Sequence, residues 1–193
     1  SGKNPANAIW FWGEGRKPAL TPFTEKTGLV GAVVSAVDLV QGIGKCADMR
    51  VLHVPGATGT YKTNFTGKME AAFDALQTDC DYVYIHMEAP DECGHQHQVQ
   101  EKVYAIEQID EKVLSPLMYR LGEAGEKFTI LLLPDHPTPL SLRTHVGDPV
   151  PYALYRCGEV NRRAVRYCER DAASTGILIP EGYTLIDRML GRR

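Results

Sequence analysis

Three short segments of the chain combine acidic residues and histidines in patterns that suit metal binding. The segment APDECGH places Asp91 and His95 four residues apart, directly after the apolar run DYVYIHM. The segment PDHPTP holds the adjacent pair Asp135 and His136 after a second apolar run, and His145 follows in SLRTH. Carboxylate and imidazole groups are ligands that Mn²⁺ and Zn²⁺ both accept. These five residues are therefore the candidate ligands of a metal site.

The number of candidate ligands bears on what the site can do. Two adjacent divalent ions need about six protein ligands, so the five residues form most of a two-metal site with one carboxylate missing. Each residue taken alone is better explained by a surface or capping role, and only their combination favours a metal. Cys93 would bind zinc as a thiolate, but it points away if Asp91 and His95 share one helical face. Nearby hydroxyl groups on Thr138, Ser141 and Thr144 have no setting distinctive of a nucleophile.

Strand-like and helix-like segments alternate along the chain. Strands are expected at 7–13, 49–55, 81–87, 128–134 and 150–155. Helices are expected at 28–45, 68–77, 98–121 and 184–190, and residues 156–182 form a polar excursion. This alternation predicts an α/β fold with a mainly parallel sheet. Because such sheets bind ligands beyond the carboxyl ends of their strands, the candidate ligands are expected to converge at one edge of that sheet.

Composition and charge narrow the class of protein. The chain has 193 residues, 44% of them hydrophobic, which suits one domain with a sizeable core. Its net charge of −3 gives no electrostatic argument for nucleic acid or an anionic membrane as a partner. No apolar run approaches the roughly 18 residues of a membrane span, and no secretory signal is visible. The five cysteines are scattered without a CxxC pair, which predicts reduced thiols and a cytoplasmic location.

Longer segments resemble one enzyme family. APDECGH, LLLPDHPTPLSLRTH, GDPVPYALY and VPGATGTYKTNFTGKMEAAFDAL together resemble cofactor-independent phosphoglycerate mutase of the archaeal type, in the alkaline phosphatase superfamily. The likeness runs over about residues 7–155. It implies a three-layer core, present here in part, with helices on both faces of a mainly parallel sheet. It also implies two divalent ions of the Mn²⁺, Zn²⁺ or Mg²⁺ type and a small phosphorylated substrate.

The resemblance also assigns roles to the candidate ligands. Asp91, His95 and His145 match the ligands of one ion, and Asp135 and His136 match two ligands of the other. The family's serine nucleophile and a further aspartate match no segment of this sequence. The resemblance therefore implies that both lie outside these 193 residues, which alone would be inactive and would hold one ion or none.

Two basic residues are further candidates for contacts with a phosphate group. Lys68 in NFTGK loosely matches a lysine that faces the transferred phosphate, and a solvent-facing lysine at a helix start is the alternative. Arg16 lies in NAIWFWGEGRKP, which resembles the returning end of a domain inserted in the family. We therefore expect residues 1–15 to hold a cloning scar and the end of that insert. Residues 16–193 are expected to form the C-terminal part of the catalytic domain.

The leading hypothesis is an interconversion of 3- and 2-phosphoglycerate through a phosphoserine. A homoserine kinase on the same scaffold is an alternative, and it would need a nucleotide as phosphoryl donor. The sequence lacks the nucleotide-binding pattern GxxxxGK[ST], but this scaffold would not require it. A non-catalytic domain with a structural metal is a second alternative, although structural zinc sites are usually closed and rich in cysteine. The physiological metal and the oligomeric state stay open at this point.

Overall fold

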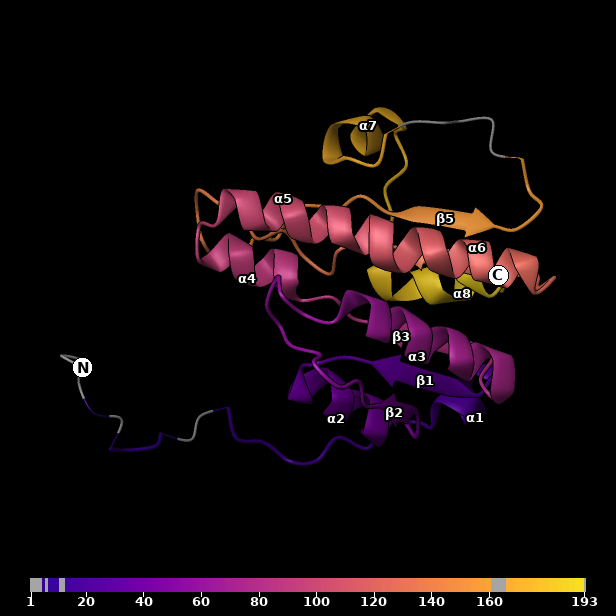
Figure 1. The fold of residues 1–193 in the computed structure, drawn as a ribbon, viewed down its shortest axis with the longest axis horizontal. Coiled ribbons are helices and arrows are strands. Elements are labelled where there is room, and N and C mark those ends of the chain that lie inside the picture. The colour runs from indigo at the N-terminus through magenta and orange to yellow at the C-terminus, as the bar shows by residue number, and fades with distance from the viewer. Residues whose placement is uncertain (1–4, 6, 11–12, 161–165, 193) are drawn as a thin grey trace.

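The computed structural model describes residues 5, 7–10, 13–160 and 166–192, and its central feature is a parallel sheet (Figure 1). The strands are β1 (Gly31–Val34), β2 (Arg50–Leu52) and β3 (Tyr82–Ile85), in the order β2-β1-β3. In the register of this sheet, Val33 lies opposite Val51 on one side and Tyr84 on the other. The central strand β1 is buried along its whole length. The predicted strands at 49–55 and 81–87 are confirmed.

Helices cover both faces of this sheet. On one face α2 (Asp38–Cys46) approaches so closely that a Cβ on Gly44 would lie 2.6 Å from a methyl carbon of Val33. The short helix α1 (Phe23–Thr27) packs on the same face. On the other face Ala32 packs with Ala75 of α3 (Phe65–Thr78). The three-layer α/β arrangement is confirmed for this part of the chain.

The expectation of one buried helix over 28–45 is wrong, because the segment contains β1 and then α2. A short run such as GAVV that is apolar on every side satisfies a buried helix and a central strand of a parallel sheet equally well. Pairing with β2 and β3 decides in favour of the strand. The helix begins only at Asp38, after β1 has ended at Val34.

The helix predicted at 98–121 is confirmed as one continuous helical run. It consists of α5 (Val99–Gln108), a π-helical segment η1 (Ile109–Leu114) and α6 (Ser115–Glu123). Its inward face packs on α3, and Figure 1 shows the two lying side by side. The buried residues of this helical core are Phe65, Met69, Ala89, Ala105, Val113, Leu117 and Leu121. This core supports the shorter helix α4 (Ala89–His95), which follows β3.

The predicted strands at 128–134 and 150–155 exist, but they do not join the parallel sheet. They form β4 (Thr129–Leu132) and β5 (Ala153–Arg156), which pair antiparallel as a separate two-stranded sheet. Parallel pairing needs a crossover connection, usually a helix, whereas residues 133–152 contain no helix and return directly. The expectation of one sheet edge shared by all candidate ligands is therefore corrected to two neighbouring sheets.

The strand predicted near the N-terminus and the helix predicted near the C-terminus had different outcomes. Residues 7–10 and 13 are in no strand, and Trp10 is 86% exposed, so the strand predicted at 7–13 is wrong for these residues. Residues 11 and 12 lie outside the described part. Near the other end, η2 (Gly182–Thr184) and α8 (Leu185–Met189) confirm the predicted terminal helix. The polar excursion contains α7 (Glu169–Ser174), and its residues 161–165 lie outside the described part.

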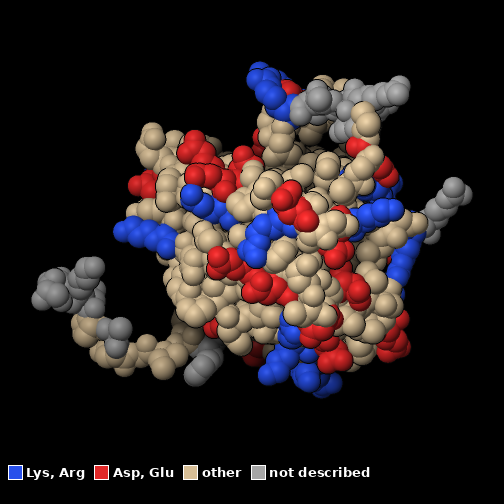
Figure 2. All heavy atoms as spheres, turned by 45° about the vertical axis from the view of Figure 1, so that its right-hand side comes forward, with Lys and Arg blue, Asp and Glu red and all other residues tan. Residues whose placement is uncertain are grey.

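The surface carries both signs of charge. On the face shown in Figure 2, acidic and basic side chains lie intermingled over most of the molecule. Within the described residues, every helix is too short or too polar to cross a lipid bilayer. The five cysteines are all free thiols.

Candidate metal centre

The first half of the candidate site is carried by α4. Pro90 lies in the first turn of this helix, where proline's missing N–H costs no hydrogen bond. Asp91 and His95 lie one turn apart on the same face, with Oδ2 of Asp91 3.3 Å from Nε2 of His95. Cys93 and Gly94 face inward and are buried. Helical spacing alone thus brings the carboxylate and the imidazole together, as predicted.

The second half is carried by the loop of residues 133–152, which we call the ligand loop. This loop has no regular structure and is held by side chains from the α4–α5 region. Nζ of Lys102 donates to the carbonyl of Thr138 at 2.9 Å, and Nδ1 of His97 donates to the carbonyl of Leu140 at 2.7 Å. At Gly94 a Cβ would lie 2.6 Å from the carbonyl oxygen of Thr138, so only glycine permits this approach. The loop therefore takes its shape from tertiary contacts.

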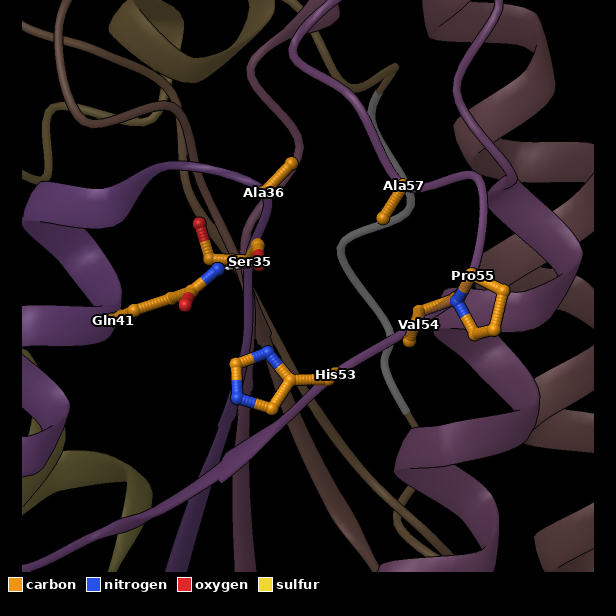
Figure 3. Close-up of a pocket in the computed structure, with 7 residues that line it drawn as sticks. All are labelled: Ser35, Ala36, Gln41, His53, Val54, Pro55 and Ala57. Carbon is orange, nitrogen blue, oxygen red and sulfur yellow. Dashed lines mark hydrogen bonds between the residues drawn. The ribbon is translucent and has the colours of Figure 1, made fainter.

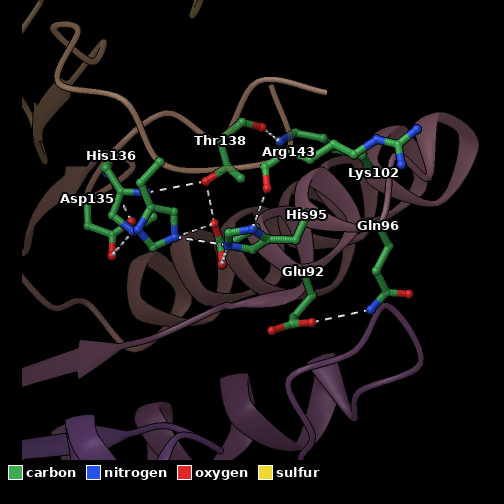
Figure 4. A network of polar contacts seen from close by, with 10 residues as sticks. Glu92, His95, Gln96, Lys102, Asp135, His136, Thr138 and Arg143 are labelled. Atoms are coloured by element: carbon green, nitrogen blue, oxygen red, sulfur yellow. Dashed lines mark hydrogen bonds and ion pairs between the residues drawn. The ribbon is translucent and has the colours of Figure 1, made fainter. Parts of the chain in front are cut away.

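The five candidate ligands are joined by contacts in one cluster (Figure 4). Ligand atoms of Asp91, His136 and His145 all lie within 4.8 Å of one another. Nε2 of His145 lies 3.3 Å from Oδ1 of Asp91 and 3.0 Å from Nε2 of His95. Asp135 lies at the margin, with Oδ2 3.4 Å from Nε2 of His136. His136 thus lies close to Asp91 and His145 as well as to Asp135.

The proton on His95 can be placed from its hydrogen bonds. Nδ1 lies 2.9 Å from the carbonyl oxygen of Arg143, and a carbonyl oxygen only accepts, so Nδ1 carries the hydrogen. In the neutral ring Nε2 then has the free electron pair, and Nε2 is the atom that faces Asp91 and His145. Metal-binding histidines are held in this way, with the other ring nitrogen donating to a carbonyl or a carboxylate.

The donor set therefore fits a divalent ion. One carboxylate and several imidazole nitrogens face a common point, and their side chains are partly open to solvent. Exposure rises from 25% for the side chain of Asp91 to 52% for that of His145. Cys93 does not join them, because it is 1% exposed and burial raises the pKa of its thiol. The thiolate that zinc would need is disfavoured there.

Lys68 lies at the carboxyl end of β3, close to this cluster. It is 1% exposed, and its Nζ donates to the backbone carbonyl of His86 at 3.2 Å. The alternative of a solvent-facing lysine is therefore wrong. Burial lowers the pKa of Lys68, while the carboxylate of Glu88 opposes that shift. Arg16 is exposed on the irregular segment before α1.

Two further titratable residues at this edge were missed from the sequence. Burial lowers the pKa of His86, with Asp135 opposing the shift. Burial also raises the pKa of Glu88, and the carboxylates of Glu92 and Asp91 add to that effect. Both residues follow β3 directly, so the rule that selected Asp91 would have selected them as well.

A cavity of about 360 Å³ opens at the carboxyl ends of β1 and β2 (Figure 3). Its polar lining comes from Ser35, Gln41 and His53. The Oγ of Ser35 lies 3.2 Å from Nδ1 of His86, which links the cavity to the end of β3. The same Oγ accepts a hydrogen bond from the backbone N–H of Val37, an arrangement typical of a turn before a helix.

Relatives of known name are similar over nearly the whole chain. A probable 2,3-bisphosphoglycerate-independent phosphoglycerate mutase of Geobacter sulfurreducens is 49% identical, over 99% of this chain and 48% of that protein. A 2,3-bisphosphoglycerate-independent phosphoglycerate mutase of Methanosarcina acetivorans is 47% identical, over 91% of this chain and 44% of that protein. The chain thus spans about half the length of the curated relatives it matches.

Solved structures show the same relationship. The PH0037 protein of Pyrococcus horikoshii superposes with a TM-score of 0.77 at 28% identity, over 92% of this chain and 53% of that one. A cofactor-independent phosphoglycerate mutase of Thermoplasma acidophilum superposes with a TM-score of 0.65 at 26% identity, over 90% of this chain and 39% of that one. The α/β fold is therefore shared with a structure of the family that the sequence resembles.

A model of a whole protein family matches in addition to these single relatives. The family is described as the metalloenzyme superfamily, and its model covers residues 3–178. The covered range includes β1 to β5 and both halves of the cluster around Asp91 and His145. Since the match extends over most of the sequence, the chain belongs to the metalloenzyme superfamily.

Proposed function

We propose that the protein is a metal-dependent, 2,3-bisphosphoglycerate-independent phosphoglycerate mutase that interconverts 3- and 2-phosphoglycerate through a phosphoserine. The observation that carries the proposal is the convergence of Asp91, His136 and His145. Relatives that are 47–49% identical and named as such mutases support it. Membership of glycolysis, a cytoplasmic location and the serine outside these residues remain predictions.

Residues of the cluster would divide between two ions. Asp91, His95 and His145 would hold one ion, and Asp135 and His136 would contribute to the other. A bound divalent ion neutralises phosphate oxygens and lowers the pKa of a coordinated hydroxyl, which is the chemistry that phosphoryl transfer needs. Mn²⁺, Zn²⁺ and Mg²⁺ remain the candidate ions, because a mixed carboxylate and imidazole set accepts the first two readily.

Lys68 would add the positive charge that a phosphate group needs. It is buried beside the end of β3, where its ammonium group is held by the carbonyl of His86. The attraction between an ammonium group and a phosphate is stronger at such a buried site, where the effective dielectric constant is lower than in water. Arg16 remains a weaker proposal, because it lies on an exposed segment.

The alternatives have less support. The two named relatives are mutases, and no observation favours a homoserine kinase. A purely structural metal is disfavoured by the open, cysteine-free cluster, because structural zinc sites are closed. The proposed division into residues 1–15 and 16–193 stays a prediction.

The test uses the intact protein in which these residues occur. After chelation, conversion of 3- to 2-phosphoglycerate is expected to stop and to return with Mn²⁺, Zn²⁺ or Mg²⁺. His145→Ala is expected to lower Mn²⁺ affinity and turnover together, whereas His53→Ala, outside the cluster, is expected to leave Mn²⁺ affinity unchanged. Mutase turnover that is unaffected by chelation would contradict the proposal. Turnover of homoserine with ATP, and none of phosphoglycerate, would favour the kinase instead.

A further inference from the structure

Thr138 occupies a central place between the two halves of the cluster. The residue is 4% exposed, although the ligand loop that carries it is largely open to solvent. Its Oγ donates to Oδ1 of Asp91 on α4 and lies 3.3 Å from Nδ1 of His136 (Figure 4). One hydroxyl therefore contacts a candidate ligand on each half.

The direction of these two hydrogen bonds follows from simple counting. A threonine hydroxyl has one hydrogen, and an ionised carboxylate can only accept. The hydrogen of Thr138 is therefore used on Asp91. The contact with His136 then requires Nδ1 of the ring to donate to Oγ. Neutral His136 is thereby left with its free electron pair on Nε2.

The backbone around Thr138 fixes this hydroxyl in place. Its carbonyl oxygen accepts from Nζ of Lys102 at 2.9 Å and lies against Gly94. Pro137 and Pro139 flank it on either side and restrict the chain further. Because the backbone of Thr138 is restrained, its hydroxyl has a fixed position and can orient the groups that it contacts.

We propose that Thr138 is a positioning residue for the metal centre. It selects the tautomer of His136 with hydrogen on Nδ1 and orients Asp91, so that each of the two residues presents an electron pair to the ion that it would hold. His95 is held in the same tautomer by the carbonyl of Arg143. Two imidazoles therefore carry their hydrogen on Nδ1, each because of a different hydrogen-bond acceptor. The inference rests on the metal centre of the proposed function, and not on which substrate that centre serves.

The experiment compares two variants of Thr138 in the intact protein. Thr138→Val keeps the shape of the side chain but removes the hydroxyl, and Thr138→Ser keeps the hydroxyl. Thr144→Val is the matched control, because Thr144 is exposed on the same loop. The tautomer of His136 is read by NMR of ¹⁵N-labelled histidine without metal at about pH 8, where an ordinary histidine is neutral. Mn²⁺ affinity is measured by calorimetry.

The expected results concern the tautomer of His136 and the Mn²⁺ affinities of the three variants. In the unmodified protein His136 carries its hydrogen on Nδ1. Thr138→Val weakens Mn²⁺ binding by about 10–100-fold, the usual cost of losing a group that orients a ligand. Thr138→Ser restores the affinity, and Thr144→Val leaves it unchanged.

Other results would overturn the inference. Hydrogen on Nε2 of His136 in the unmodified protein refutes it, even if Thr138→Val fails to fold. A folded Thr138→Val variant with unaltered Mn²⁺ affinity refutes it too, as does a folded Thr138→Ser variant that binds Mn²⁺ as weakly as Thr138→Val. If mutase turnover is absent while the tautomer and the affinities behave as expected, the proposed substrate is wrong and the role of Thr138 stands.

Discussion

Helix α4 and the ligand loop face each other across the cluster, and they hold their residues in different ways. On α4, Asp91 and His95 are related by helical spacing, and the inward face at Cys93 is packed in the interior. In the ligand loop, His136 and His145 depend on hydrogen bonds from other elements to the backbone. Changes on the helix are therefore expected to act on metal binding directly. Changes at the contact between the two are expected to act through the position of the loop.

The largest effect is expected on the helix side, from Asp91→Asn. This change removes the carboxylate that faces His95 and His145, so Mn²⁺ affinity should fall by more than the roughly 100-fold that marks the upper end for groups outside the ligand set. Calorimetry measures it. Glu92→Gln, one residue along the same helix, removes the same charge from outside the cluster and serves as control. Equal affinities of the two variants would show that Asp91 is not a ligand.

The next effect is expected where the helix and the loop meet, from Gly94→Ala. The new Cβ would lie 2.6 Å from the carbonyl of Thr138, so the loop must move, at a cost of about 1–3 kcal/mol in the free energy of unfolding. Gly122→Ala, in α6, meets no atom within 4 Å and should stabilise by up to about 1 kcal/mol. Urea denaturation of both variants provides the comparison. A stabilised Gly94→Ala variant would mean that the loop is not in close contact there.

A smaller effect is expected from removing one hydrogen bond to the loop. Lys102→Met eliminates the donor to the carbonyl of Thr138 and should cost about 1 kcal/mol. Hydrogen exchange should then rise in the ligand loop and remain unchanged in β1. Lys112→Met is the control, because its pair with Glu111 is exposed to solvent and should contribute little to stability. Equal hydrogen exchange of the ligand loop in both variants would show that Lys102 does not hold the loop in place.

The smallest effect on stability at neutral pH is expected from the buried Lys68. Burial lowers its pKa in the folded protein below the ordinary 10.5, so the unfolded chain binds more protons between the two values. The free energy of unfolding of the protein should therefore rise with pH in that window, relative to Lys68→Met. Urea denaturation of both proteins from pH 7 to 10.5 measures the difference. A difference that falls as the pH rises would contradict the burial of a charged lysine.

Much of the candidate site follows from local sequence. The helical relation of Asp91 and His95, and the placement of both acidic segments after strands, are consequences of short-range spacing. The helical run over 98–121 was equally clear, because its apolar residues recur at helical intervals. Such features depend on residues three or four positions apart, and this spacing can be read directly from the sequence.

Other features depended on which segments become neighbours in space. The run GAVV is a strand because β2 and β3 flank it, and Lys68 is buried because α3 lies against the end of β3. β5 pairs antiparallel because the chain between it and β4 returns without a helix. None of these partners is close in sequence, so periodicity and residue type could not select them.

Local sequence alone therefore indicates which residues are of types suited to bind a metal and which strands they follow. That His136 lies close to Asp91 and His145, and that Thr138 lies between the two halves of the cluster, follows from contacts between segments far apart in the sequence. The difference arises because helix spacing is a local property of the backbone. The ligand loop has no spacing of its own, and it takes its shape from hydrogen bonds donated by Lys102, His97 and His95.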